Sequence, residues 1–173
     1  MTQSKGSTLI SDAAVGTAAG YGATLLMEHA SSWMYEHVES SAARQREEQL
    51  RDAMPTVVMA GKLNDRLGKP LSADRVQKVG EWLHFGFGVA WGPAYAIARR
   101  RTTIGPLKLG LLLGAGVSLV FDEGLTPAAG FSPPNRAFPW QTHARAFSAH
   151  LVFGAGIAGL VETGTHLAPG ARR

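Results

Sequence analysis

Residues 105–121 read GPLKLGLLLGAGVSLVF, and this stretch decides the expected fold class. Lys108 is its only charged residue, and polar side chains do not recur every three to four residues as they do on the helices of soluble proteins. A helix that crosses a bilayer needs about 20 predominantly apolar residues. The stretch therefore predicts a transmembrane helix, with a buried helix of a soluble bundle as the alternative.

Three more segments have a similar character. Residues 79–98 read VGEWLHFGFGVAWGPAYAIA, and residues 144–161 read ARAFSAHLVFGAGIAGLV. Residues 9–35 are rich in small side chains and carry two acidic residues, so they qualify marginally. Together the four segments predict an all-α integral membrane bundle of about four transmembrane helices, which forms a single domain over residues 1–173.

The composition agrees with this fold class. Charged residues make up 17% of the chain, whereas about 25% is typical of soluble domains. Cysteine is absent, which excludes disulfides, thiolate metal sites and a cysteine nucleophile. Glycines four residues apart lie on one helix face and let two helix backbones approach closely. Three predicted helices carry such a pair: Gly16 with Gly20, Gly88 with Gly92, and Gly110 with Gly114.

Two connections differ from the four segments. Residues 36–78 are mixed in charge and favour one or two extramembrane or interfacial helices, which would serve either as a solvated connector or as a docking surface. Residues 122–143 are rich in proline and glycine and predict an irregular, ordered loop.

The net charge is +4, and we attribute this basic balance to the orientation of the protein in the membrane rather than to nucleic-acid binding. Arg99, Arg100 and Arg101 follow an apolar segment, where the positive-inside rule places cytoplasmic charge. We therefore expect a multi-pass protein with both termini on the cytoplasmic side. Its expected partners are the lipid bilayer and either another membrane protein or further copies of the chain.

Ionisable residues in the four segments should meet at one depth. Successive helices run in opposite directions, so residues late in one segment and early in the next lie near the same interface. Ionisable groups inside membrane segments usually face the bundle interior. The expected polar cluster comprises Glu28, His29, Glu81, His84, Asp122, Glu123, Arg145 and His150.

Such a cluster has three interpretations. Imidazoles and carboxylates can bind zinc, iron or manganese, and the metal candidates are His29, His84, His150, Glu28 and Glu81. Haem ligation by two histidines is a variant that no spacing specifies. The cluster could instead take up protons, because histidine titrates near pH 6.5. The third interpretation is structural, with Arg145 paired to Asp122 or Glu123.

The stretches HFGFGVAWGPAYAI, LGAGVSLVFDEGLTPAAGF and PWQTHARAFSAHLVFGAGIAGLVE resemble the YagU-like family of bacterial inner membrane proteins. The resemblance covers most of the chain except the charged stretch after His37. The positions that carry it are His84, Gly92, Pro93, Asp122, Glu123, Pro127, His143 and His150. It implies a location in the bacterial cytoplasmic membrane and no defined activity, although one member is linked to acid tolerance.

The sequence contains no nucleophile elbow and no dinucleotide fingerprint after a strand, which favours a non-enzymatic protein. We expect a membrane protein of envelope or acid-stress physiology with a proton-responsive cluster and no required cofactor. The alternatives are an accessory subunit of a larger membrane complex and a metal- or haem-binding membrane component.

Overall fold

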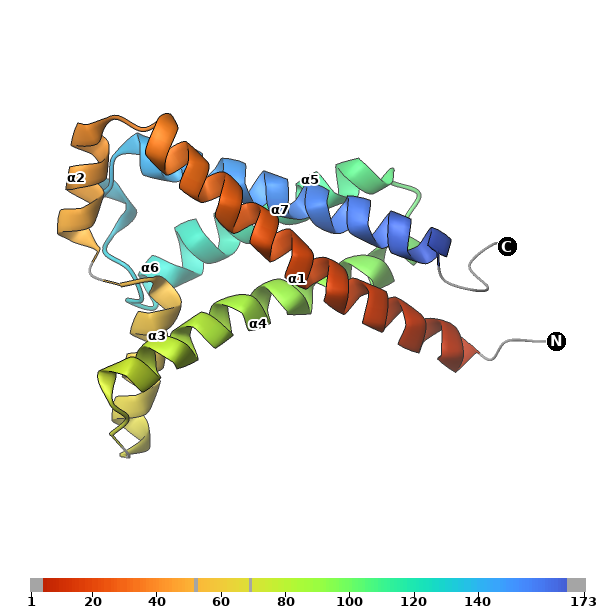
Figure 1. Ribbon diagram of the computed structural model, residues 1–173, viewed down its shortest axis with the longest axis horizontal. Coiled ribbons are helices and arrows are strands. Elements are labelled where there is room, and N and C mark those ends of the chain that lie inside the picture. Colours follow the sequence, from red (N-terminus) through yellow and green to blue (C-terminus); the bar gives the residue numbers. More distant parts are fainter. Residues whose placement is uncertain (1–4, 52, 69, 168–173) are drawn as a thin grey trace.

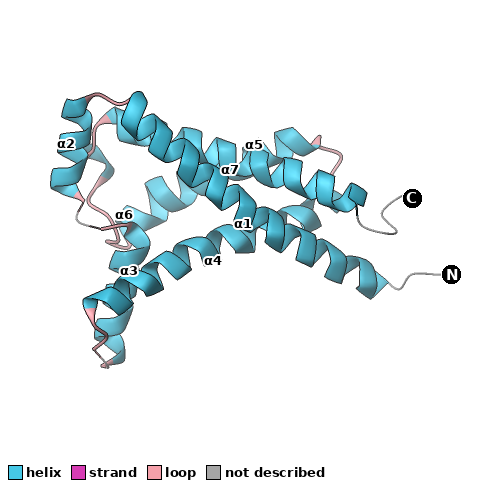
Figure 2. Ribbon diagram, viewed as in Figure 1, coloured by secondary structure: helices cyan, strands magenta, loops and turns pink. Residues whose placement is uncertain are grey.

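Four long helical segments dominate the structure, a computed structural model that describes residues 5–51, 53–68 and 70–167 (Figure 1). The described residues form helices joined by short connections, and none of them lies in a β-strand (Figure 2). The long segments are α1 (Lys5–His37), α4 (Ala73–Arg100), α7 (Trp140–Leu167) and a continuous run of α5 (Pro106–Val117), η1 (Ser118–Leu125) and α6 (Thr126–Ala128). The predicted all-helical class is confirmed.

Two of these segments are long and apolar enough to cross a membrane, namely residues 106–128 and 140–166. Helices α1 and α4 are not among them, because glycine, polar and charged residues lower their mean hydropathy. All four helices extend beyond the predicted spans. The largest difference is at residues 122–128, which continue the helix where the sequence predicted an irregular loop.

Helix α1 lies in the middle of the molecule. It packs against α4 on one side and α7 on another, and α5 packs against α7 (Figure 1). The core between α1, α4 and α7 is built around Tyr95, Phe153 and Ile157, together with small alanines. Because alanine side chains are short, the three helix backbones lie close together.

The crossing of α1 and α4 uses both predicted glycine pairs. A Cβ added to Gly16 would lie 2.6 Å from the nitrogen of Pro93 and 2.7 Å from the carbonyl carbon of Gly92. A Cβ added to Gly20 would lie 2.7 Å from the carbonyl oxygen of Gly88. Backbone therefore touches backbone here, and the predicted close approach is confirmed. Pro93 does not interrupt α4.

The third glycine pair packs against α7. A Cβ on Gly110 would overlap the carbonyl oxygen of Gly154, and a Cβ on Gly114 would overlap that of His150. This contact holds the α5–η1 segment against α7. It also brings the π-helical part of the segment next to the first turns of α7, where several ionisable residues lie.

Helices α2 (Ser41–Leu50) and α3 (Pro55–Leu67) form the connector between α1 and α4, as the prediction of one or two helices required. The hydroxyl of Ser40 caps α2 by accepting a hydrogen bond from the amide of Ala43 at 3.3 Å. Helix α3 ends at Gly68, whose φ of 66° favours glycine. Helix α2 lies at the end of the bundle that holds the last turns of α1 and the first turns of α7, and α3 packs beside the first turns of α4 (Figure 1).

Candidate functional site

Three histidines contact carboxylates near the end of the bundle where α2 lies. Each pair joins two segments that are separate in the sequence. His84 on α4 lies 3.3 Å from Glu28 on α1. The other two pairs join α7 to η1: His150 lies 3.3 Å from Asp122, and His143 lies 2.7 Å from Glu123. One pair therefore joins α1 to α4, and the other two join α7 to the segment of α5, η1 and α6.

The π-helix η1 supplies two of the three carboxylates. π-Helices are rare and often mark functional sites. Pro127 has no amide hydrogen and cannot donate to the carbonyl of Glu123 four residues earlier. The side-chain amide of Asn135 donates to that carbonyl instead, at 2.7 Å. The irregular segment after α6 thus folds back onto the end of η1.

His143 touches an acceptor with each ring nitrogen. Its Nδ1 lies 2.7 Å from Oε1 of Glu123, and its Nε2 lies 3.1 Å from the backbone carbonyl of Asn135. A carbonyl and an ionised carboxylate can only accept hydrogen bonds, whereas a neutral imidazole has one N–H. Both contacts can therefore be hydrogen bonds only when the His143–Glu123 pair holds one additional proton.

His150 has one fixed nitrogen and one available nitrogen. Its Nδ1 lies 2.9 Å from the carbonyl oxygen of Ala146, which can only accept, so Nδ1 carries the hydrogen of the neutral ring. A second proton would then bind at Nε2. The charged ring would form an ion pair with Asp122, whose Oδ2 lies 3.3 Å from Nδ1.

Asp122 has further charged groups around it besides His150. His150, Glu123, Arg51 and His84 all lie close enough to act on its charge. They come from α7, η1, the residue after α2, and α4. A proton bound by His150 or His84 would therefore add a positive charge near Asp122.

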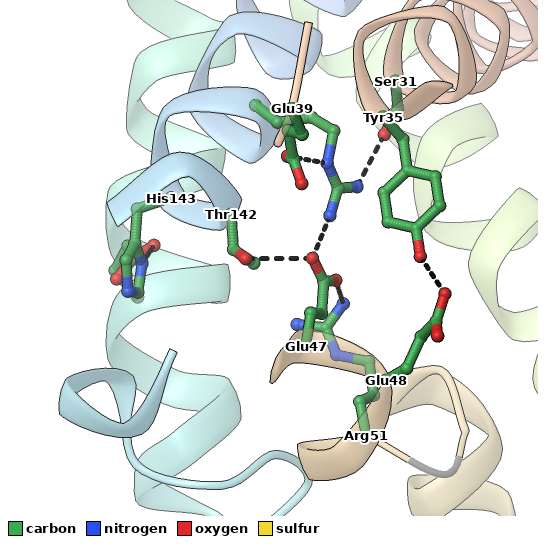
Figure 3. A network of polar contacts seen from close by, with 10 residues as sticks. Ser31, Tyr35, Glu39, Glu47, Glu48, Arg51, Thr142 and His143 are labelled. Carbon is green, nitrogen blue, oxygen red and sulfur yellow. Dashed lines mark hydrogen bonds and ion pairs between the residues drawn. The ribbon is translucent and has the colours of Figure 1, made fainter. Parts of the chain in front are cut away.

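Arg145 forms a second polar network beside the histidine pairs (Figure 3). Its guanidinium contacts Glu39 at 2.6 Å and Glu47 at 2.5 Å, and it donates to the hydroxyl of Ser31 at 3.2 Å. Glu47 also accepts a hydrogen bond from Thr142 at 2.9 Å. The sequence-based pairing of Arg145 with Asp122 or Glu123 is wrong, because the connector brings two other carboxylates closer.

The opposite end of the bundle holds two arginine–carboxylate pairs. Arg100 binds Asp12 through two nitrogens, with an Nη2–Oδ1 distance of 2.6 Å, and Asp12 is buried. Arg99 binds Glu162 at 2.9 Å. Arginine stays charged over the physiological pH range, so these two pairs keep their charge when the medium acidifies. The contacts that contain histidine lie at the other end.

The structure places five of the eight residues predicted for the cluster in histidine–carboxylate pairs. Glu28, His84, Asp122, Glu123 and His150 take part in the pairs described above. His29 is exposed, and Glu81 is exposed and accepts a hydrogen bond from Gln77. His143 lies outside the predicted cluster, because the sequence predicts an irregular loop over residues 122–143.

The described part of the chain holds no assembled set of ligands for a metal ion. Across residues 5–51, 53–68 and 70–167, no three histidine, aspartate or glutamate side chains lie close enough to hold one metal ion. Among the five metal candidates, His84 and Glu28 form a pair, while His150 is paired with a carboxylate outside that set.

Comparisons with known proteins do not identify the chain. No family model, no curated protein and no solved structure matches it. The function proposed below therefore rests on the chemistry of the site.

Proposed function

We propose that this chain is a non-enzymatic, multi-pass membrane protein whose histidine–carboxylate end responds to proton concentration. The observation that carries the proposal is the geometry of His143, whose two acceptors are both satisfied only when the pair with Glu123 holds an extra proton. A bacterial inner membrane location, as the family resemblance implies, belongs to the same proposal.

The apolar surface of the helices supports the membrane part. Only 22% of the apolar window in residues 106–128 and 33% of that in residues 140–166 are buried within the protein. A core helix of a soluble bundle would be mostly buried, whereas a lipid-facing helix exposes apolar side chains. Leu107, Leu112 and Leu119 are each more than half exposed.

The distribution of charge supports the proposed orientation. Arg99, Arg100 and Arg101 lie at the end of the bundle where α4 connects to α5. The three large exposed tryptophans, Trp33, Trp82 and Trp140, lie toward the other end, near the interface position that this residue prefers. The positive-inside rule then places the arginines on the cytoplasmic side and the histidine pairs on the opposite side.

Acidification should strengthen the contacts of His143 with Glu123 and Asn135. Without the extra proton, His143 has a single N–H for two acceptors, and one of its contacts to Glu123 or Asn135 is lost. Uptake of a proton restores both contacts and adds an ion pair. Because both side chains of the pair are about one-third exposed, solvent screening limits the expected gain to about 1 kcal/mol.

The proposal is tested by the unfolding free energy of purified protein in detergent at pH 7.5 and at pH 5.5. The wild type should gain stability at pH 5.5 relative to a His143→Gln variant, which keeps a polar side chain and cannot take up the proton. His29→Gln is the matched control, because His29 is exposed on α1. An identical pH response in wild type and His143→Gln would refute a role for this pair, and full release of the protein from membranes by alkaline carbonate would refute the membrane assignment.

A further inference from the structure

Helix α3 and the first turns of α4 form an antiparallel hairpin that projects from the end of the bundle (Figure 1). Its two arms touch along one side. A Cβ on Gly80 would lie 2.5 Å from the Cα of Val57, and one on Gly61 would lie 3.8 Å from Val76. Near the tip, the side chain of Asn64 accepts a hydrogen bond from the amide of Leu71 at 2.9 Å.

These contacts fix which side of each helix faces its partner, so the remaining positions can be assigned to faces. Successive residues of a helix are rotated by about 100°. When the rotation about the axis of α3 is counted from Val57, Leu63 and Leu67 fall on one flank of the hairpin. Counted from Gly80 on the antiparallel α4, Val79 falls on the same flank and Trp82 lies next to it. We call this flank the apolar face of the hairpin.

The side chains of the apolar face are exposed although they are large and hydrophobic. Leu63 is 50% exposed, Leu67 67%, Val79 38% and Trp82 81%. Exposed apolar groups that cluster in this way mark a surface that meets a partner or a membrane.

The opposite flank of the hairpin is acidic. By the same count, Asp65 of α3 and both Asp74 and Glu81 of α4 fall there, and all three are exposed. Glu81 accepts a hydrogen bond from Gln77, which lies on the same flank. The carboxylates of the hairpin are thus kept away from its apolar face.

Basic side chains border the apolar face. Arg66 of α3 and both Arg75 and Lys78 of α4 are exposed on the outer sides of the two arms. On α4, Lys78 precedes Trp82 by four residues and Arg75 precedes it by seven, which corresponds to about 6 and 10 Å along a helix. Aromatic residues at the membrane interface with basic residues just beyond them, at the level of the phosphates, are the usual arrangement at the end of a membrane helix.

We infer that the hairpin docks on the bilayer surface, with its apolar face among the lipid headgroups and Arg66, Arg75 and Lys78 on the phosphates of anionic lipids. This inference rests on the proposed membrane location. Charge complementarity selects an anionic lipid surface as the occupant: over residues 55–82 the chain has five basic residues and three acidic ones, and the acidic ones face away. The acidic flank of the hairpin then faces the water.

The absence of cysteine makes a direct test straightforward, because a single introduced cysteine can carry a spin label. Full-length Leu67→Cys and Asp65→Cys variants are labelled and reconstituted into vesicles of phosphatidylcholine with or without phosphatidylglycerol. Collision with oxygen, which partitions into lipid, is compared with collision with a water-soluble nickel chelate. With phosphatidylglycerol present, the label at 67 should collide mainly with oxygen and the label at 65 mainly with nickel.

A third label separates this inference from the proposed function. Leu112 is 54% exposed on α5, within an apolar segment of membrane length. If the Leu112→Cys label collides mainly with oxygen, the bundle is inserted. If the labels at 67 and 65 then collide equally often with the nickel chelate, the docking inference is overturned. If the label at 112 is itself open to nickel, the membrane assignment fails.

The role of charge is tested in the Leu67→Cys background. Replacing Arg66, Arg75 or Lys78 by glutamine should lower the ratio of docked to undocked hairpin in anionic vesicles by about fivefold per residue. The matched control is Arg46→Gln, because Arg46 is exposed on α2 outside the hairpin. Equal docking in vesicles with and without phosphatidylglycerol would overturn the assignment of anionic lipid.

Discussion

Replacement of Gly16 by alanine tests whether the crossing of α1 and α4 depends on direct backbone contact. The new Cβ would lie 2.6 Å from the nitrogen of Pro93, whereas ordinary contact begins at 3.4 Å, so the two backbones must separate by about 0.8 Å. A gap of about 0.5–1 Å removes a quarter to a half of the dispersion attraction between facing atoms. Overpacking of this kind costs about 1–3 kcal/mol.

The matched control is Gly22→Ala on the same helix. There the added Cβ meets only the end of the Leu160 side chain, at 3.0 Å, and a flexible side chain can move. Both variants gain the same higher helix propensity of alanine, about 1 kcal/mol, so this gain cancels in their difference. Gly16→Ala should therefore be less stable than Gly22→Ala by about 1–3 kcal/mol, measured by reversible unfolding of purified protein in mixed micelles. A difference below about 0.5 kcal/mol, the usual effect of a surface substitution, would refute the backbone-contact argument.

Two further substitutions test polar contacts. Arg145→Gln removes the cation that lies between two buried carboxylates: Glu39 loses its ion pair, and Glu47 keeps only the one with Arg51, at 3.3 Å. The substitution should cost about 3–5 kcal/mol of unfolding free energy. It should also make α2 more sensitive to limited proteolysis, whereas Arg46→Gln on the exposed side of α2 should do neither. Tyr95→Phe removes the hydrogen bond from a buried hydroxyl to the carbonyl of Pro106, a distance of 3.0 Å, and should cost about 1 kcal/mol. An unfolding free energy equal to that of the wild type would show that this bond contributes nothing.

The sequence predicted the helices and their close contacts because both depend on local patterns. Gly16 and Gly20 are four residues apart, and so are Gly88 and Gly92, and such spacing necessarily places each pair on one helix face. The structure then shows the two pairs meeting each other. Which pair meets which was not predictable, because spacing within one helix contains no information about its partner.

The site was predicted less completely, for two physical reasons. The partners of Arg145 lie in the connector, and the pairing depends on how α2 folds back over the bundle, which no local pattern encodes. His143 was assigned to an irregular loop, whereas α7 begins at Trp140 and carries this histidine on its first turn. The π-helical conformation of residues 118–125 also has no clear sequence signal, although Pro127 is consistent with a change in hydrogen bonding there.

The position of α1 between α4 and α7 has a consequence for the order in which the tertiary contacts can form during synthesis. Helix α1 is synthesised before both helices that cover it. Its Asp12 carboxylate pairs with an arginine 88 residues later, and Arg145 lies 114 residues after the Ser31 hydroxyl that it contacts. Contacts between such distant residues form slowly, because a long loop must close first. Helix α1 therefore leaves the ribosome before α4 and α7 but is fully enclosed only after both have formed, and a nascent chain that ends before α7 exposes one side of α1.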